Sequence, residues 1–249
     1  MMFRKGIRMT LAAPNGQWRC AGITDVGKLR KHNEDALLNR ADLGLWVVAD
    51  GMGGHQRGEV ASALLCAELA RIPGNLSLAG AVDAIDERTL EVNARLVAMA
   101  AEMDEGAVIG CTLVAMVARG AFCACLWAGD SRLYRLRQGQ LYLLSEDHSP
   151  NSHYGSAGDT VTSVKSNFIT RAVGADSSLH LDVDCFALEV RDRFLLCSDG
   201  LSDEISDSGI STLLAGGDCD ESAERLVAEA LRNGGRDNVT AVILDYCGA

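Results

Sequence analysis

The sequence predicts an α+β fold in which a central antiparallel β-sandwich is flanked by pairs of antiparallel helices, giving four layers in the order αββα. Two observations lead to this prediction. Short apolar runs of strand length are followed by helical patterns twice along the chain, and glycine-containing turn signals separate neighbouring runs. No internal repeat is visible and nothing favours two domains, so we expect an N-terminal extension over residues 1–16 and one domain over residues 17–249.

The first part of this domain carries two strand signals and two helix signals. Residues 18–25 and 45–49 have the length and apolar content of strands, whereas residues 27–35 are charged without periodicity, as in a loop. Apolar residues then recur at helical spacing, over residues 61–72 and again over residues 82–103. The two helices are predicted to lie as an antiparallel pair on one face of a sheet.

Strands dominate the next part of the chain. Hairpin signals separate four strand-like runs and predict an antiparallel meander. These runs are residues 110–118, 121–128, 131–137 and 141–144. Residues 147–168 then lack periodicity, and a loop of this length inside a compact domain is usually functional or mobile.

The C-terminal part repeats the order of strand and helix. The apolar run 193–197 leads to a second Asp-Gly pair at Asp199. Ser202 is predicted to cap a helix from residue 203 to about 214, and Asp220 to cap another helix that ends near residue 233. Two further runs read as strands, residues 184–188 and 239–244.

Charge and cysteine content restrict the class of protein. The 23 Lys and Arg residues against 34 Asp and Glu residues give a net charge of −11, which argues against a nucleic-acid or anionic-membrane partner. No apolar run reaches the length of about 18 residues that a membrane span needs. Most of the nine cysteines lie in apolar runs and lack zinc-site spacing, so we expect reduced thiols and a cytoplasmic protein.

Asp50 stands at the tip of an apolar strand and is followed by a glycine-rich turn. The absence of a side chain at Gly51, Gly53 and Gly54 leaves bare backbone beside this carboxylate. A hard cation that shares the Asp50 carboxylate and a backbone carbonyl is one interpretation. The alternative is an ordinary glycine turn with a solvated aspartate.

Further acids occupy similar places in the predicted sandwich. Asp199 follows an apolar strand, as Asp50 does, and Asp237 precedes one. If strand ends cluster at one rim, these acids converge and repel each other by several kcal/mol, unless cations lie between them or their pKa values rise. Ligation by oxygen alone favours Mg²⁺ or Mn²⁺ over Zn²⁺. Taken singly, each acid is more simply explained as a surface charge, but as a set with two Asp-Gly pairs at strand tips the acids favour a metal site.

Five motifs, in order over residues 18–244, resemble those of the bacterial PPM family of metal-dependent Ser/Thr protein phosphatases, also called protein phosphatase 2C. The motifs are Thr24-Asp25-Val26-Gly27 through Arg30 to Asn33-Glu34-Asp35-Ala36, Val48-Ala49-Asp50-Gly51-Met52-Gly53-Gly54-His55, Ala128-Gly129-Asp130-Ser131-Arg132, Ser198-Asp199-Gly200-Leu201 and Gly235-Arg236-Asp237-Asn238-Val239-Thr240. The resemblance implies a β-sandwich flanked by helix pairs, with two Mn²⁺ or Mg²⁺ ions at one end.

The resemblance also implies the metal ligands. Asp50 would bridge the two ions, Asp199 and Asp237 would bind the first, and the Gly51 carbonyl would bind the second. Asp130, with Asp199, would form a third and weaker metal site.

The resemblance also implies roles for residues that do not bind a metal ion directly. By resemblance, Glu34 would hold the second ion through water, Asp35 would orient the site, and Arg30 would bind the substrate phosphate. Eukaryotic members place a histidine at the position of Met52, so His55 is the candidate general acid here; its alternative role is packing or capping at the next helix. The flap-like segment at residues 147–168 is shorter than in bacterial members, which leaves substrate preference undefined.

The predicted function is hydrolysis of phosphoserine and phosphothreonine in proteins by direct attack of a metal-bridging hydroxide. By resemblance, the counterpart would be a bacterial Ser/Thr protein kinase, and we expect a monomer. A non-catalytic phosphopeptide-binding or partner-switching module of the same fold is the alternative, which the filled ligand positions disfavour. Action on a nucleotide or sugar phosphate is a third reading, and the absence of a P-loop motif argues against it.

Overall fold

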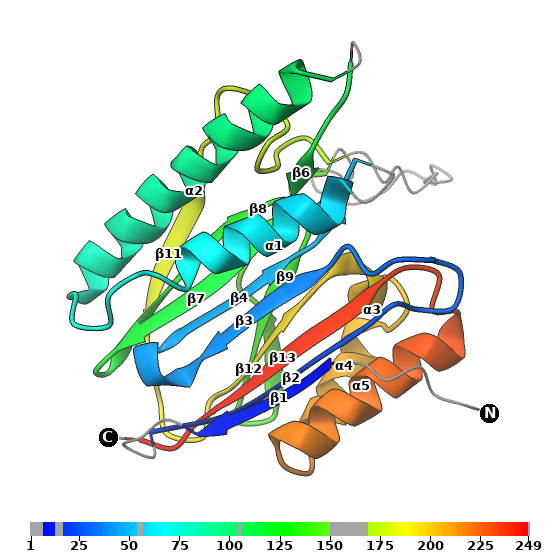
Figure 1. Cartoon of the computed structure of the whole chain (residues 1–249). Helices are drawn as coiled ribbons and strands as arrows, with labels where there is room; N and C mark the ends of the chain where they lie inside the picture. Colours follow the sequence, from blue (N-terminus) through cyan, green and yellow to red (C-terminus); the bar gives the residue numbers. More distant parts are fainter. Residues whose placement is uncertain (1–6, 13–16, 54–56, 104–105, 150–168, 249) are drawn as a thin grey trace, which may run out of the picture.

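Two antiparallel sheets pack face to face, and a helical layer covers the outer face of each (Figure 1). The computed structural model describes residues 7–12, 17–53, 57–103, 106–149 and 169–248. Helices α1 and α2 cover one sheet, and α4 and α5 cover the other. The predicted four-layer αββα sandwich is therefore confirmed.

The six-stranded sheet has the order β1-β2-β13-β12-β9-β10. Its strands are β1 (Ile7–Ala12), β2 (Trp18–Asp25), β13 (Val239–Tyr246), β12 (Arg193–Cys197), β9 (Arg132–Arg137) and β10 (Gln140–Leu143). Strand β1 lies within the segment predicted as an extension and pairs along its whole length with β2. No strand is predicted there from the sequence.

The five-stranded sheet has the order β11-β8-β7-β4-β3, and a short two-stranded ladder joins β5 and β6. Its strands are β11 (Asp182–Ala187), β8 (Phe122–Ala128), β7 (Leu113–Arg119), β4 (Leu45–Ala49) and β3 (Ala36–Arg40), and the ladder consists of β5 (Gly51–Met52) and β6 (Gly110–Cys111). Strand β4 is buried along its length, which explains its continuous apolar sequence.

The described residues form five helices, of which four lie near the predicted positions and one short helix is not predicted; both predicted N-caps are wrong. They are α1 (Arg57–Leu69), α2 (Leu78–Ala101), α3 (Asp199–Ser202), α4 (Asp207–Leu214) and α5 (Cys219–Asn233), with a 3₁₀ turn at Ala41–Leu43. The cap of α2 is Ser77, those of α4 and α5 are Ser206 and Asp218, and each side chain accepts a backbone N–H of the first turn. The predicted caps Ser202 and Asp220 instead lie inside α3 and α5.

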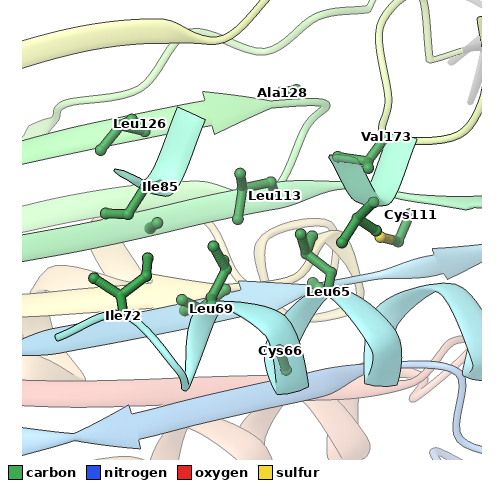
Figure 2. Packing of buried hydrophobic residues seen from close by; sticks show 14 of the residues in the cluster. Leu65, Cys66, Leu69, Ile72, Ile85, Cys111, Leu113, Leu126, Ala128 and Val173 are labelled. Atoms are coloured by element: carbon green, nitrogen blue, oxygen red, sulfur yellow. The ribbon is translucent and has the colours of Figure 1, made fainter. Parts of the chain in front are cut away.

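Three apolar clusters hold the layers together. Figure 2 shows the cluster between the α1–α2 pair and the five-stranded sheet, where Leu65 and Ile85 face Leu113. Between the two sheets, the rings of Trp18 and Trp46 pack with centroids 4.8 Å apart. The third cluster joins the six-stranded sheet to α4 and α5. Burial from both sides fixes each sheet relative to its neighbours.

The predicted meander is wrong at one turn. Strands β7 and β8 form a hairpin in one sheet and β9 and β10 form one in the other, so the Gly129-Asp130 turn passes from sheet to sheet. Gly129 has a φ of 113°, and a Cβ there would lie 2.7 Å from the Thr112 side chain. The crossing therefore requires glycine.

No helix among the described residues has both the length and the apolar content to cross a bilayer.

Candidate active site

Asp50 leaves the end of β4 with its backbone fixed by Thr112. The Asp50 N–H donates to Thr112 Oγ1 at 2.9 Å, and the Thr112 N–H donates to the Asp50 carbonyl at 2.8 Å. Thr112 Oγ1 lies 2.7 Å from the hydroxyl of Ser131, which follows Asp130 in the crossing turn. One threonine thus ties the strand that carries Asp50 to the turn that carries Asp130.

Gly51 lies where three backbone segments meet. A Cβ at Gly51 would overlap the carbonyl oxygen of Gly58 in α1 and lie 2.5 Å from the Glu34 carbonyl oxygen. That Glu34 oxygen accepts the Gly51 N–H at 3.1 Å and the Ser62 hydroxyl at 2.6 Å. The absence of a side chain at Gly51 therefore allows α1 and the segment before β3 to approach Asp50.

Asp35 is buried between the two sheets and held by two hydroxyl groups. Its Oδ2 accepts hydrogen bonds from Ser198 at 2.7 Å and Thr240 at 2.6 Å. Burial raises the pKa of Asp35 to about 7, against the lowering effect of these two hydrogen bonds, and the charges of Asp199 and Asp237 raise it further. Asp35 thus lies close to the other acids, just before β3.

Asp199 and Asp130 approach Asp50 from the six-stranded sheet and the crossing turn. Burial raises the pKa of Asp199, and the charge of Asp237 adds to this. Burial also raises the pKa of Asp130 to about 7, with Asp199 as the next contribution. The pKa of Asp50 lies well above its usual value because of burial first, and then because of the charges of Asp35, Asp199, Asp130 and Asp237. These five acids therefore share one electrostatic field.

Three carboxylate oxygens in this cluster are buried without a hydrogen-bond partner. They belong to Asp35, Asp130 and Asp199. Buried charge without compensation is strongly unfavourable, and oxygen atoms are the preferred ligands of hard divalent cations. Within the described residues, no three Asp, Glu, His or Cys side chains are already gathered as a metal-binding group. Two observations therefore indicate that the site suits divalent cations: the three carboxylate oxygens without a hydrogen-bond partner, and the negative charges that raise the pKa values of neighbouring acids.

Arg30 lies at the mouth of the cluster. Its Nη2 donates to Asp237 Oδ2 at 2.6 Å, and its side chain remains 55% exposed. This hydrogen bond raises the pKa of Arg30 more than partial burial lowers it, and the charges of Asp50 and Glu34 add to the rise. An ion pair this exposed contributes only about 0–1 kcal/mol, so the guanidinium can exchange Asp237 for another anion.

Asn238 organises the site in a way that the sequence analysis misses. Its Nδ2 donates to the carbonyls of Val26 and His32, both at 2.9 Å, and its Oδ1 accepts the Glu34 N–H at 2.8 Å. The buried amide thereby fixes the segment that carries Arg30 and Glu34. The side chain of an asparagine in a turn usually forms hydrogen bonds with the nearby backbone. The sequence around Asn238 therefore gives no sign that its hydrogen-bond partners lie two hundred residues away.

His148 connects the other side of the site to the base of the flap-like segment. Its Nδ1 accepts the Gly129 N–H at 3.0 Å, which assigns the ring proton to Nε2, 3.1 Å from Asp182. Asp182 also binds Arg171, with Nη1 and Oδ1 2.6 Å apart. The candidate acid His55 and residues 150–168 of the flap-like segment lie outside the described residues.

The cluster thus combines acids from both sheets, unpartnered carboxylate oxygens and one exposed guanidinium. The family model for protein phosphatase 2C matches residues 29–236. The chain belongs to the protein phosphatase 2C family. This confirms the resemblance found in the motifs.

Individual relatives agree with this family membership. The chain is 35% identical over 234 residues to the serine/threonine protein phosphatase PstP of Mycobacterium tuberculosis, covering 91% of this chain and 45% of PstP. It therefore spans about half the length of that relative. A solved structure of PstP's catalytic domain in complex with two manganese ions has a TM-score of 0.79 at 36% identity, covering 92% of this chain and 97% of that one. PppA, described as a key regulatory component of T6SS in Pseudomonas aeruginosa, has a TM-score of 0.85 at 40% identity, with 95% and 99% of the two chains covered.

Proposed function

We propose that this chain is a metal-dependent protein phosphatase that hydrolyses phosphoserine and phosphothreonine in proteins. The observation that carries the proposal is the cluster of buried acids with unpartnered oxygens beside the exposed guanidinium of Arg30. Such a cluster is unfavourable without cations, and a guanidinium at its mouth is suited to bind a phosphate group. Family membership supports the same function.

The ligand set is proposed to hold two Mn²⁺ or Mg²⁺ ions and a third, weaker one. Asp50, the Gly51 carbonyl, Asp199 and Asp237 would bind the pair, and Asp130 with Asp199 the third. When bound, such ions lower the pKa of water and polarise a phosphoryl group. The two manganese ions in the related PstP structure support this proposal.

The chain's own residues prepare the site for a phosphate. Arg30 would transfer its two-pronged donor group from Asp237 to the phosphate oxygens, which also frees Asp237. Asp35 would keep the site oriented through Ser198 and Thr240, which bind it from the opposite sheet. Glu34 would act through water, with its backbone fixed by Asn238.

A cysteine-based phosphatase mechanism is disfavoured by where the cysteines lie. The spacing Cys-x5-Arg occurs from Cys185 to Arg191 and from Cys219 to Arg225. Cys185 lies within the edge strand β11, and the residues after Cys219 are helical in α5. Neither stretch can wrap its backbone N–H groups around a phosphate as a phosphate-binding loop does.

The cellular setting is also a proposal. We propose a monomer in the cytoplasm that opposes a Ser/Thr protein kinase. All nine cysteines lie in the described residues and no disulfide joins any two of them, which supports a reducing compartment. A non-catalytic phosphopeptide-binding module remains the alternative to be tested. Asp50, Asp199 and Asp237 are all present, which disfavours loss of turnover.

The test is hydrolysis of p-nitrophenyl phosphate and of a phosphothreonine peptide, with Mn²⁺ added or chelated. We expect activity that requires the metal and that falls at least about a hundredfold in Asp199→Asn, because a ligand is lost. The matched control Asp83→Asn, an exposed acid on α2, should keep wild-type rates. Activity that ignores chelation, or that survives Asp199→Asn, would refute the mechanism, and phosphopeptide binding without turnover would favour the non-catalytic module.

A further inference from the structure

Residues 28–32, here called the cationic loop, concentrate positive charge beside the acidic site. The loop reads Lys28-Leu29-Arg30-Lys31-His32, contains no acid, and is exposed at every position. The chain has only four lysines and a net charge of −11, yet two of the lysines occur in these five residues. The cationic loop is therefore locally positive, although the protein as a whole is negatively charged.

The cationic loop is held in place at both ends. Gly27 has a φ of 75°, and a Cβ there would overlap the Asp237 carbonyl oxygen, so the chain turns tightly before the loop. The Lys28 N–H donates to the Gly235 carbonyl at 2.7 Å, and the His32 carbonyl accepts the Asn238 amide at 2.9 Å. In Figure 1 the turn between β2 and β3 lies beside the turn that precedes β13. The lysines are therefore presented on a fixed backbone.

The two lysines are not neutralised by the acids around them. Arg30 is paired with Asp237, and the nearby Arg236 is paired with Glu204, with Nε and Oε1 2.8 Å apart. Within the described part of the chain, neither Lys28 nor Lys31 forms an ion pair. The rim of the site thus carries two positive charges free to act on a bound molecule.

We propose that Lys28 and Lys31 determine substrate specificity by selecting phosphorylated segments that carry acidic residues beside the phosphoserine or phosphothreonine. This inference rests on the proposed phosphatase function. An acidic phosphopeptide is repelled by a protein of net charge −11, and two lysines on either side of Arg30 offset that repulsion where the peptide must lie. Charges at the rim of a binding site chiefly set partner choice and association rate.

The experiment compares two phosphothreonine peptides that differ only in flanking residues, glutamate in one and lysine in the other. We expect wild type to have a kcat/KM roughly tenfold higher for the glutamate peptide, since each exposed charge pair changes affinity by a few fold. The preference should shrink at high salt because exposed charges are screened. Lys28→Glu combined with Lys31→Glu should abolish or reverse it.

Controls separate this inference from the proposed function. The double variant should unfold at the wild-type temperature, which reports that it folds, and its preference is measured as the ratio of its own kcat/KM values for the two peptides. Arg71→Glu combined with Arg191→Glu changes the net charge equally at exposed positions just after α1 and before β12, and should keep the preference. Equal rates on both peptides in wild type, or an unchanged preference in the lysine variant, would overturn the inference. Failure of wild type to hydrolyse any of these substrates would refute the phosphatase function itself.

Discussion

Replacing Asn238 tests whether one amide holds in place the segment that carries Arg30 and Glu34. Asn238→Ala removes three hydrogen bonds, two donated to the Val26 and His32 carbonyls and one accepted from the Glu34 N–H. At about 0.5–1.5 kcal/mol for each bond, the free energy of unfolding should fall by about 2–4 kcal/mol. For a domain of this size that corresponds to a decrease in Tm of roughly 5–15 °C.

Activity should fall together with stability because the same segment carries Arg30. We expect kcat/KM on p-nitrophenyl phosphate to drop at least about tenfold, since a misplacement near 1 Å can reduce rates by about a hundredfold. Asn238→Asp sharpens the test, because it keeps an acceptor for the Glu34 N–H but turns a carboxylate oxygen towards two carbonyls.

The measurements are thermal unfolding and steady-state kinetics on both variants. Asn233→Ala is the matched control, since this exposed asparagine donates one hydrogen bond, to the Glu204 carbonyl, and its loss should change stability by at most about 1 kcal/mol. If Asn238→Asp unfolds at the wild-type temperature with wild-type KM, the amide does not hold the segment and the reasoning fails.

Three other perturbations test the proposed role of Arg30 in phosphate binding, the close packing at Gly51 and the raised pKa values of the buried acids. Arg30→Ala should raise KM for p-nitrophenyl phosphate about tenfold or more but change the unfolding free energy by less than about 1 kcal/mol, because its ion pair is exposed; an unchanged KM would exclude a role in phosphate binding. Gly51→Ala should lower the unfolding free energy by about 2–4 kcal/mol, because its Cβ would overlap the Gly58 carbonyl oxygen; a wild-type Tm would contradict this. Since the folded-state pKa values of Asp35 and Asp130 are raised to about 7, the folded protein binds more protons than the unfolded chain between about pH 4 and pH 7. Stability in a chelator should therefore be highest below this window and decrease as pH rises through it, by about 4 kcal/mol for each of the two groups; Tm values in a chelator that do not decrease from pH 5 to pH 8 would oppose this assignment.

Periodicity in the sequence is sufficient to predict the layers of this fold. The continuous apolar run of β4 and the helical spacing in α1 and α2 each reflect burial against a neighbouring layer, so local pattern and tertiary structure agree. The caps are harder to predict. Ser202 and Ser206 offer the same side-chain acceptor, and only packing decides that the chain forms the short α3 before α4 begins.

The candidate site was predictable where a residue's own neighbours mark it. Asp50 and Asp199 each end an apolar strand and precede glycine, and this local pattern is enough to locate them at the rim of a sandwich. The residues that hold the acids in place could not be predicted in this way. Thr112 contacts Asp50 only after distant strands pair, and its sequence neighbours are ordinary strand residues. Ser198 and Thr240 lie within two of the motifs, but nothing in those motifs shows that both bind Asp35.

The division of the acids between the two sheets has a consequence for the order of folding. Asp50 follows β4 of the five-stranded sheet, whereas Asp199 follows β12 and Asp237 precedes β13 of the six-stranded one. The chain passes between the sheets several times, so no single stretch of chain contains one whole sheet alone. The proposed ligand set is therefore complete only once the two sheets have docked, and an intermediate in which only one sheet has formed would be inert towards phosphate esters.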